Sequence, residues 1–533
     1  MKTIKLLVAG LLAMALALPQ ASSAAPGAGA ERARVYVVYK DGQRGNAARA
    51  LAMAGAEVHY DFAGLRGYAV SVPAAALEGL TRNPAIEFVE EDARRYLMAE
   101  TVPYGIIAVQ ANLVAAATAT GNTQVCIIDS GYTSGHEDLP SSNVTGHNDP
   151  GGSGNWYEDQ NGHGTHVAGT VAAVGGNAKG VVGVLPSVAA SGSSVSLFIV
   201  KVFGAEGWTY SSSLVDALNK CTGNPVRGGR NLVVSMSLGG SIKSRVEDSA
   251  FASAHGTGKV LSIAAAGNDG NSRNSYPASY SSVVSVAAID ESRNWATFSQ
   301  YNSQVELSAP GVAVLSTVPT GTGTSATVTV GGVTPDPEAD AMDGSWRGGG
   351  SGALVDCGIG DTTCVDASGK VCLIQRGTVS FADKVLNCQA GGGVAAIIYN
   401  NVDGPLLGTL GGVATSIPSV GVSSTDGSRL LGKLGASASV SVVAGDYAKF
   451  DGTSMATPHV AAVAALVWSN YPSCTNAQLR NVLDTTALDL GAVGRDVYFG
   501  FGLVQAKAAL DQIAANGCGS AGGGGGKGGG KKP

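Results

Sequence analysis

From about Val102 onward the chain repeats one pattern, in which short, continuous apolar runs alternate with longer stretches of helical periodicity. Apolar runs of this kind are typical of strands that are buried on both faces, as in a parallel sheet covered by helices on both sides. The sequence therefore predicts an α/β domain with a doubly wound, mainly parallel sheet. The runs are TQVCIIDSG, VSLFIVKVF, NLVVSMSLGG, VLSIAAAGN and VVSVAAID.

Several of these predicted strands end in polar or glycine-rich residues. Asp129 and Ser130 follow the first strand, Ser237 to Gly240 end another, and Gly267 and Asn268 end a third. Open α/β sheets bind their ligands beyond the carboxyl ends of the strands. We therefore expect these polar groups to gather along one edge of the sheet and to form a site there.

Two further units are predicted on either side of this pattern. Residues 32–98 show strand, helix, strand, strand, helix and strand patterns in that order, which predicts a small α+β, ferredoxin-like fold. Between residues 323 and 445 the α/β pattern stops, and four of the eight cysteines lie there. The pattern resumes at YAKFDGTSM, so residues 323–445 are expected to form an inserted domain. A later helix is expected to begin with a capping box of Thr475 and Gln478.

The ends of the chain read as an export signal and a tail. Lys2 and Lys5 precede the apolar run LLVAGLLAMALAL, which predicts a signal peptide over residues 1–24. The run is too short for a membrane anchor, so we expect a secreted, extracellular protein, or a cell-surface or periplasmic one, without stable membrane insertion. Residues 519–533 are rich in glycine and lysine and predict a flexible tail.

Composition narrows the partners and the redox compartment. The chain is 44% hydrophobic with a net charge of −6, which suits a folded chain with a large core and implies no nucleic-acid partner. Eight cysteines in an exported chain predict disulfides, and their spacing does not suggest a zinc site. The pairing stays open, with local pairs within Cys357 to Cys388 and a Cys474–Cys518 pair as hypotheses.

Three stretches carry residues suited to nucleophilic catalysis: VCIIDSG with Asp129, NGHGTHVAGT with His163, and GTSMATPHV with Ser454. A serine hydroxyl needs a base to take its proton, and histidine is the natural base near neutral pH. A buried carboxylate then orients the imidazole. Ser454 begins a predicted helix, where free N–H groups can hold a developing oxyanion.

These three motifs resemble those of the subtilisin-like (subtilase) serine peptidases, and the match covers most of Val102 to Asn516 outside the insert. The resemblance implies a peptidase domain over residues 99–516, interrupted by the insert. It implies a triad of Asp129, His163 and Ser454. It also implies that Asn268, in AAAGNDG, donates a side-chain N–H to the oxyanion. His166 and His459 lie in the same motifs and are expected to be structural.

The same resemblance indicates where a substrate would bind. SMSLGG is similar to the strand with which these peptidases pair an extended peptide. The small residues of AAAG would line a roomy, apolar pocket for the residue before the scissile bond. The implied substrate-binding residues are Ser237, Leu238, Gly239, Gly240, Ala264, Ala265, Ala266 and Gly267.

A structural calcium ion is a further implication of the resemblance. Asp138 stands where the family has a calcium carboxylate, and Asn177 lies in the loop that corresponds to the family's calcium loop. That loop departs from the family in length and residues, so a solvated aspartate and a plain loop are the alternative. No cofactor is expected to be required for the chemistry.

Both flanking units resemble known companions of subtilases. Residues 32–98 resemble the inhibitor-type propeptide, which acts as a folding aid and an intramolecular inhibitor. AETVPYG resembles the start of mature subtilisins, which suggests cleavage near Met98 and Ala99. LIQRGTVSFADKVLNCQAGGGVAAIIYNN resembles a protease-associated (PA) domain. Such an insert is either a lid that selects large protein substrates or an appended domain with little effect on catalysis.

The leading hypothesis is therefore a secreted, monomeric serine endopeptidase that cleaves proteins or peptides through an acyl-enzyme and is made as a self-processed zymogen. A catalytically silent binding protein is the first alternative, and it would be expected to have lost at least one of Asp129, His163, Asn268 and Ser454. A secreted esterase is disfavoured, because it would be expected to have a GxSxG elbow and the order Ser-Asp-His.

Overall fold

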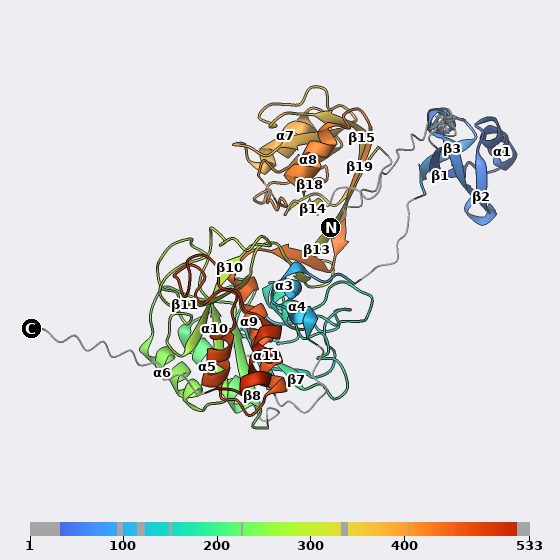
Figure 1. Cartoon of the computed structure of the whole chain (residues 1–533). Coiled ribbons are helices and arrows are strands. Elements are labelled where there is room, and N and C mark those ends of the chain that lie inside the picture. The colour runs from blue at the N-terminus through green and yellow to red at the C-terminus, as the bar shows by residue number, and fades with distance from the viewer. Residues whose placement is uncertain are drawn as a thin grey trace, which may run out of the picture. The chain divides into compact units, whose positions relative to one another are not determined.

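The computed structural model divides the chain into two compact units, Met1–Leu97 and Met98–Pro533 (Figure 1). The predicted signal peptide, the proposed cleavage site near Met98 and all of the predicted tail after Gly519 lie outside the described residues. The structure describes residues 32–92, 100–114, 123–148, 152–224, 228–331, 339–402 and 404–519.

The first unit has one antiparallel sheet with strand order β2-β3-β1-β4. Its strands and α-helices follow each other in the order strand, helix, strand, strand, helix and strand. Leu51 of the first helix and Val37 and Val70 of the sheet are buried together. The elements are β1 (Arg32–Tyr39), α1 (Arg44–Met53), β2 (Glu57–Phe62), η1 (Ala63–Leu65), β3 (Gly67–Pro73), η2 (Ala74–Ala76), α2 (Leu77–Thr81) and β4 (Ile86–Glu91).

The second unit is built on a sheet of seven strands in the order β11-β10-β9-β8-β5-β7-β6, and every neighbouring pair is parallel. The predicted parallel sheet is thus confirmed. Its strands are β5 (Thr123–Asp129), β6 (Val144–His147), β7 (Val195–Lys201), β8 (Asn231–Met236), β9 (Val260–Ala265), β10 (Val283–Ile289) and β11 (Val305–Pro310).

Helices cover both faces of this sheet, because its strands are apolar on both sides (Figure 1). On β5, Val125 and Ile127 pack into the core that contains α4 and α9, whereas Cys126 and Ile128 pack into the core that contains α5 and α6. The helices of this domain are α3 (Tyr104–Ala108), η3 (Ala111–Leu113), α4 (His163–Ala172), α5 (Ser211–Gly223), α6 (Arg245–Gly256), α9 (Thr453–Asn470), α10 (Asn476–Thr485) and α11 (Ala506–Asn516).

The insert has its own seven-stranded sheet, in the order β13-β19-β15-β16-β17-β18-β14, and its own two apolar clusters. Its elements are β13 (Gly323–Val330), β14 (Ala339–Ala341), β15 (Gly348–Asp356), β16 (Val371–Gln375), α7 (Phe381–Ala390), β17 (Ala395–Tyr399), β18 (Ser419–Val422), α8 (Ser424–Leu431) and β19 (Ser437–Gly445).

The chain passes into and out of the insert through paired strands. Strand β12 (Val314–Thr317) runs antiparallel to β20 (Tyr447–Phe450), and Thr317 lies opposite Tyr447. Beyond this pair, β13 is antiparallel to β19, with Gly323 opposite Gly445. The two segments that connect the insert to the α/β domain therefore lie side by side.

All eight cysteines form disulfides. The pairs within the insert are Cys357–Cys364 and Cys372–Cys388, and Cys474 pairs with Cys518 near the end of the described chain. These three pairs agree with the sequence-based hypotheses, whereas Cys126–Cys221, which ties β5 to α5, completes the set.

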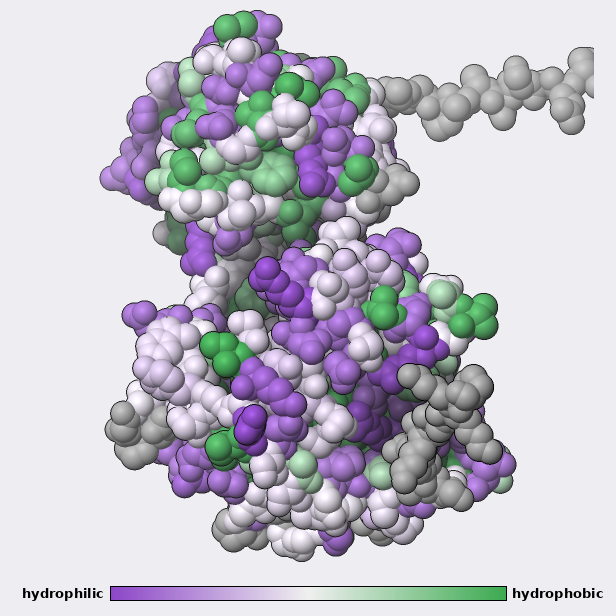
Figure 2. Space-filling view, turned by 90° about the vertical axis from the view of Figure 1, so that its left-hand side faces the viewer, coloured by the Kyte–Doolittle hydropathy of each residue, from purple (hydrophilic) through white to green (hydrophobic). Residues whose placement is uncertain are grey.

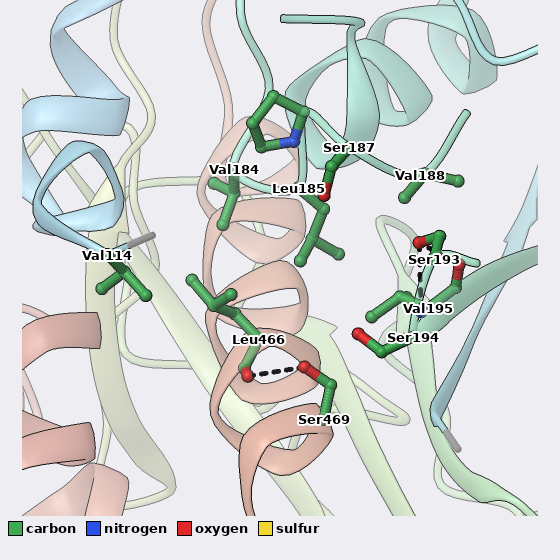
Figure 3. A pocket seen from close by; sticks show the side chains of 11 residues that line it. Val114, Val184, Leu185, Ser187, Val188, Ser193, Ser194, Val195, Leu466 and Ser469 are labelled. Carbon is green, nitrogen blue, oxygen red and sulfur yellow. Dashed lines mark hydrogen bonds between the residues drawn. The ribbon is translucent and has the colours of Figure 1, made fainter. Parts of the chain in front are cut away.

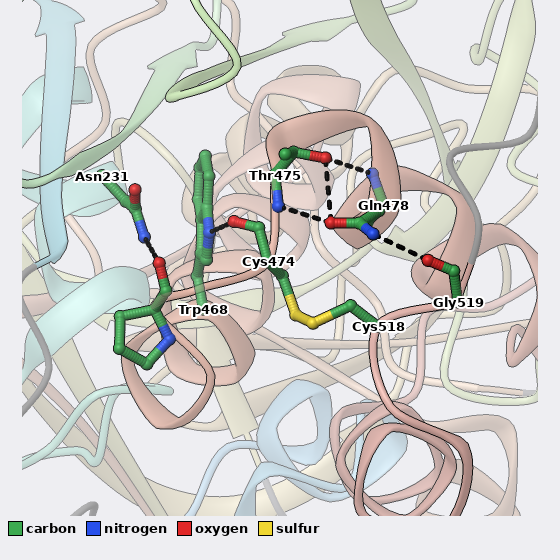
Figure 4. Close-up of a disulfide and its surroundings, with 8 residues drawn as sticks. Asn231, Trp468, Cys474, Thr475, Gln478, Cys518 and Gly519 are labelled. Atoms are coloured by element: carbon green, nitrogen blue, oxygen red, sulfur yellow. Dashed lines mark hydrogen bonds between the residues drawn. A yellow bond between two sulfur atoms is a disulfide. The ribbon is translucent and has the colours of Figure 1, made fainter.

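Figure 4 shows the surroundings of the Cys474–Cys518 bridge. The predicted capping box lies beside it: Thr475 and Gln478 bond to each other's backbone N–H at the start of α10. Gln478 also donates to the carbonyl of Gly519, at 2.7 Å. The disulfide and these hydrogen bonds fasten the last described residues to α10.

The surface and the interior outside the site show two ordinary features. On the face that Figure 2 shows, hydrophobic residues are mostly scattered among hydrophilic ones. A small cavity of about 30 Å³ lies between aliphatic side chains that include Val184, Val195 and Leu466 (Figure 3). No helix in the described part of the chain has both the length and the apolarity that crossing a membrane requires.

Candidate active site

Three element ends bring the predicted triad residues to the carboxyl edge of the parallel sheet. Asp129 is the last residue of β5, His163 is the first of α4, and Ser454 is the second of α9. Gly162 precedes α4 with a φ of 90°, a left-handed conformation that glycine adopts without a steric penalty. The chain can therefore turn sharply and present His163 at the very start of the helix.

Asp129 and His163 form the central hydrogen bond of the site. Nδ1 of His163 lies 2.8 Å from Oδ1 of Asp129, and the aspartate is fully buried while 27% of the histidine side chain is exposed. Burial by itself lowers the pKa of His163, but attraction to the Asp129 carboxylate and the hydrogen bond to it raise the pKa above its ordinary value. The arrangement favours an imidazole that accepts a proton readily.

A second carboxylate, Asp159, connects the segments that contain Asp129 and His163 through hydrogen bonds to their neighbours. It accepts hydrogen bonds from the Ser130 hydroxyl at 2.9 Å and from the N–H groups of Gly162 and Thr165, both at 2.8 Å. The Ser130 hydroxyl in turn accepts from the N–H of Gly164 at 2.8 Å. Asp159 is not part of the three sequence motifs, although an aspartate just before a predicted helix is a known capping signal.

Ser454 is held by a neighbouring strand rather than by His163. Its hydroxyl donates to the carbonyl of Ser237 at 3.2 Å, and the Ser237 hydroxyl donates to the carbonyl of Ser454 at 2.7 Å. Among the described residues, no hydrogen bond joins His163 to Ser454. Hydrogen bonds between a nucleophile and its base are often long without substrate and tighten in the complex, so this geometry is compatible with catalysis.

Asn268 and the start of α9 create a small space with two N–H donors. Oδ1 of Asn268 accepts from the N–H and the hydroxyl of Thr453, at 2.9 and 2.8 Å, so its Nδ2 faces the other way. Nδ2 donates to no residue that the structure describes. A Cβ placed on Gly452 would lie 3.5 Å from Nδ2 of Asn268 and 3.5 Å from the backbone nitrogen of Ser454. Glycine keeps this space open, and an oxyanion there would meet both donors.

A cavity of about 660 Å³ opens beside Asp129 and His163. Four of the predicted substrate-binding residues line it, namely Ser237, Leu238, Gly239 and Gly240. Of the other four, Gly267 is half-buried, and Ala264, Ala265 and Ala266 are buried and do not line this cavity. Their part in a pocket stays a prediction. The lining also contains residues that sequence analysis did not single out, among them Trp208, Tyr210 and Glu247.

The other two histidines of the motifs are buried. One ring nitrogen of each bonds to a backbone carbonyl: Nε2 of His166 to that of Val314 at 2.9 Å, and Nδ1 of His459 to that of Met455 at 2.8 Å. Burial lowers the pKa of His166 to about 3 and that of His459 to about 4. Both rings are therefore neutral at physiological pH, as structural residues would be.

The two predicted calcium ligands, Asp138 and Asn177, bond to each other in this structure, and calcium binding there stays a prediction. The Asp138 carboxylate accepts from Nδ2 of Asn177 at 2.7 Å and from the N–H of Val181 at 2.8 Å, and Oδ1 of Asn177 accepts from the N–H of Lys179. Calcium takes six to eight oxygen ligands, but the Asn177 atom that faces Asp138 is a donor. Burial also raises the pKa of Asp138, which disfavours the charged form. Hydrogen bonds occupy the place where the sequence suggested calcium.

Comparisons with known proteins agree with this geometry. The profile of the subtilase family matches residues 120–345 and 423–502, and that of the PA domain matches residues 327–430. Subtilisin E of Bacillus subtilis (strain 168) is 28% identical over 464 residues, which cover 85% of this chain and 83% of subtilisin E. Alkaline elastase YaB of Bacillus sp. (strain YaB) is 31% identical over 438 residues, which cover 81% of this chain and 76% of the elastase.

A solved structure shares the fold. The crystal structure of the psychrophilic subtilisin-like protease Apa1 from the Antarctic psychrotroph Pseudoalteromonas sp. AS-11 superposes with a TM-score of 0.67 at 42% sequence identity. The match covers 79% of this chain and all of the Apa1 chain. The fold and the site define a serine-type endopeptidase. The chain belongs to the subtilase family and contains a PA domain.

Proposed function

We propose that this chain is a secreted, monomeric serine endopeptidase that cleaves proteins with the triad Asp129, His163 and Ser454. The observation that carries the proposal is the 2.8 Å contact between Nδ1 of His163 and the buried Asp129. Ser454, at the start of α9, bonds to Ser237, which lines the same cavity as His163. Asp129 fixes the imidazole so that Nε2 is available to the nucleophile. The membership of the subtilase family supports the same roles.

In the proposed reaction, the Ser454 oxygen attacks the substrate carbonyl while Nε2 of His163 takes the hydroxyl proton. The negative charge that develops on the carbonyl oxygen is held by Nδ2 of Asn268 and the N–H of Ser454. His163 then returns the proton to the leaving amine, which leaves an acyl ester on Ser454. Water attacks this ester with His163 as the base, and the acid product departs.

We further propose that residues 32–98 act as an inhibitor-type propeptide. The β-α-β-β-α-β unit precedes the subtilase match, as an intramolecular inhibitor would. Cleavage near Met98 would release the mature enzyme, and the apolar N-terminal run would direct export. These assignments account for how a cell could make an endopeptidase without damage to itself.

The first experiment purifies the secreted protein and incubates it with casein and with a fluorophosphonate that labels activated serines. The Ser454→Ala variant serves as the matched control. The proposal expects the wild type to degrade casein and to be labelled at Ser454, and the variant to do neither. A matured wild type that shows neither cleavage nor labelling would rule the triad out and favour a peptide-binding protein without catalysis.

A further inference from the structure

Glu247 occupies an unusual place at the start of α6. Ser244 caps this helix, and its hydroxyl accepts from the N–H of Glu247. In a capping box, the glutamate at this position would return to the N–H of the capping serine. Here the N–H of Ser244 donates instead to the hydroxyl of Tyr280, at 3.0 Å. The Glu247 side chain is therefore free to turn away from its own helix end.

The Glu247 carboxylate faces the cavity beside the proposed triad. It accepts hydrogen bonds from the hydroxyls of Ser211, at 2.9 Å, and Tyr280, at 2.7 Å, and the residue lines the cavity although it is only 4% exposed. A carboxylate can accept about four hydrogen bonds, so two neutral donors leave part of its capacity unused. The buried group can accept a further donor from the cavity.

No cation of the described residues pairs with Glu247. The nearest basic residues in the sequence are Lys243 and Arg245, and both line a different surface hollow on α6. Lys243 pairs with Asp248 at 3.0 Å, and its Nζ lies 5.8 Å from the centroid of the Tyr280 ring without an ion pair to Glu247. A carboxylate that is buried without a positive partner is electrostatically costly, and a cation brought into contact with it is favoured. The wall of the cavity thus carries a buried carboxyl group that forms no ion pair with a described residue.

The rest of the cavity suits a long cationic side chain. Trp208 and Tyr210 are 59% and 67% exposed, and their rings meet edge to face with centroids 5.2 Å apart. Leu214 and Leu238 also line the cavity. Aromatic faces attract ammonium and guanidinium groups, and apolar walls accommodate the aliphatic stem that carries them. Arginine and lysine are the side chains that match both features.

The contacts of Ser237 determine how far the cavity lies from the bond that would be cut. Ser237 contacts Ser454 directly, and the strand end that lines the cavity continues to Gly240, which pairs with Tyr276. A peptide extended along these residues advances about 3.3 Å per residue, so it would reach the far end of the strand after roughly three to four residues.

We propose that this cavity is a subsite for an arginine or lysine side chain of the substrate, three or four residues away from the scissile bond, with Glu247 as its counter-charge. The inference rests on the proposed function. It adds a charge preference that neither the family membership nor the predicted pocket of small residues contains.

The test uses the mature enzyme and pairs of fluorogenic peptides that differ only in arginine or citrulline at one position, scanned on both sides of the bond. Citrulline has the shape of arginine without its charge. The ratio of kcat/KM for the two peptides is measured within each enzyme, so differences in enzyme quality cancel. We expect about a tenfold preference for arginine at one position of the wild type, because a charged hydrogen bond is gained there.

Three variants identify the group responsible. Glu247→Gln keeps the shape and removes the charge, and should abolish the preference. Ser211→Lys places an ammonium on the exposed residue that contacts Glu247, and should also abolish the preference for arginine. It provides the test if Glu247→Gln does not fold. Asp248→Asn removes the neighbouring acid of α6 and should leave the preference intact.

Each outcome decides a different question. A wild type that cleaves the peptides without any preference for arginine overturns the subsite and leaves the proposed function standing. A preference that survives Glu247→Gln, or that Asp248→Asn removes, overturns the assignment to Glu247. A matured wild type that cleaves none of the peptides, and does not cleave casein, overturns the proposed function itself.

Discussion

Oδ1 of Asn268 accepts two hydrogen bonds from Thr453, one from its N–H at 2.9 Å and one from its hydroxyl at 2.8 Å. The amide is thus fixed with Nδ2 toward the space beside Gly452 and the N–H of Ser454. A donor that is held in place before the reaction stabilises a developing charge without reorganisation. Thr453 positions Asn268, and Asn268 is the group that would touch the substrate.

Replacing Asn268 by alanine should therefore lower kcat by roughly 10²–10³ with little change in KM, a magnitude that comes from subtilisin. The reason is that the lost hydrogen bond exists only once negative charge develops. Steady-state kinetics on a short peptide provide the measurement. Asn271→Ala, three residues away and half-buried, is the control and should keep its kcat. A loss in Asn268→Ala of less than about fivefold would reject the role.

The pH profile should report the contact between His163 and Asp129. The base works only when neutral, so kcat/KM should fall as the pH drops through the pKa of His163, which lies above the ordinary 6.5. Asp129→Asn removes the attraction that raises this pKa. The variant should lose about 10⁴-fold in kcat, and its acidic limb should move to lower pH. A wild-type limb below the ordinary value, or one that Asp129→Asn leaves in place, would contradict this account.

Stability should also depend on pH, through the buried carboxyl of Asp484. Burial and then repulsion from Glu306 raise the pKa of Asp484 far above its usual 3.8, and its buried Oδ1 has no hydrogen-bond partner among the described residues. The folded protein therefore holds a proton that the unfolded chain releases. The stability that this proton contributes is complete below the usual pKa and is lost as the pH rises toward the raised one.

Asp484→Asn should consequently stabilise the protein most at alkaline pH. Thermal unfolding of Asp484→Asn and its parent, both with Ser454→Ala to prevent self-digestion, should show a Tm difference that grows between about pH 5 and pH 9. Asp511→Asn on the surface, where Asp511 pairs with Lys507, is the control and should show a small, constant difference. A difference for Asp484→Asn that shrinks with rising pH would refute the raised pKa.

The role of the insert can be separated from catalysis by excision of residues 323–445. No described residue of the insert lines the cavity beside the proposed triad, so cleavage of short peptides should change by no more than about twofold. Whole-protein substrates are then compared with the peptides. A loss confined to proteins supports a selecting lid, and equal changes on both reject selection. A folded enzyme that lacks the insert and no longer cleaves short peptides would contradict the expectation.

Much of the α/β domain was predictable because its signals are local. A strand such as β5 is a continuous apolar run, and the helix that begins at Thr453 is marked by glycine, a hydroxyl residue and an alanine-rich continuation. The Asp129, His163 and Ser454 motifs stand at such ends. The alternation of helices with parallel strands is enough to predict that these ends meet at one edge of a sheet.

Contacts between distant segments were not predictable. Glu247 reads in the sequence as an ordinary charged residue of a helix start, and its place in the cavity depends on Ser211 and Tyr280, which come from other segments. The arrangement of the predicted calcium ligands was not predictable for a similar reason. The sequence supplies an aspartate and an asparagine, but only the folded loop determines that the Asn177 amide presents its donor to Asp138.

The paired strands β12 and β20, continued by β13 and β19, have a consequence for evolution and engineering. Thr317 and Tyr447 are neighbours in one pair, as are Gly323 and Gly445 in the next, so the whole insert is equivalent to an enlarged hairpin turn. Domain insertions succeed where the two attachment points are close together. This hairpin is therefore a natural position for exchange, and chimeras that carry the insert of another relative, or an unrelated domain with adjacent termini, should preserve the α/β core.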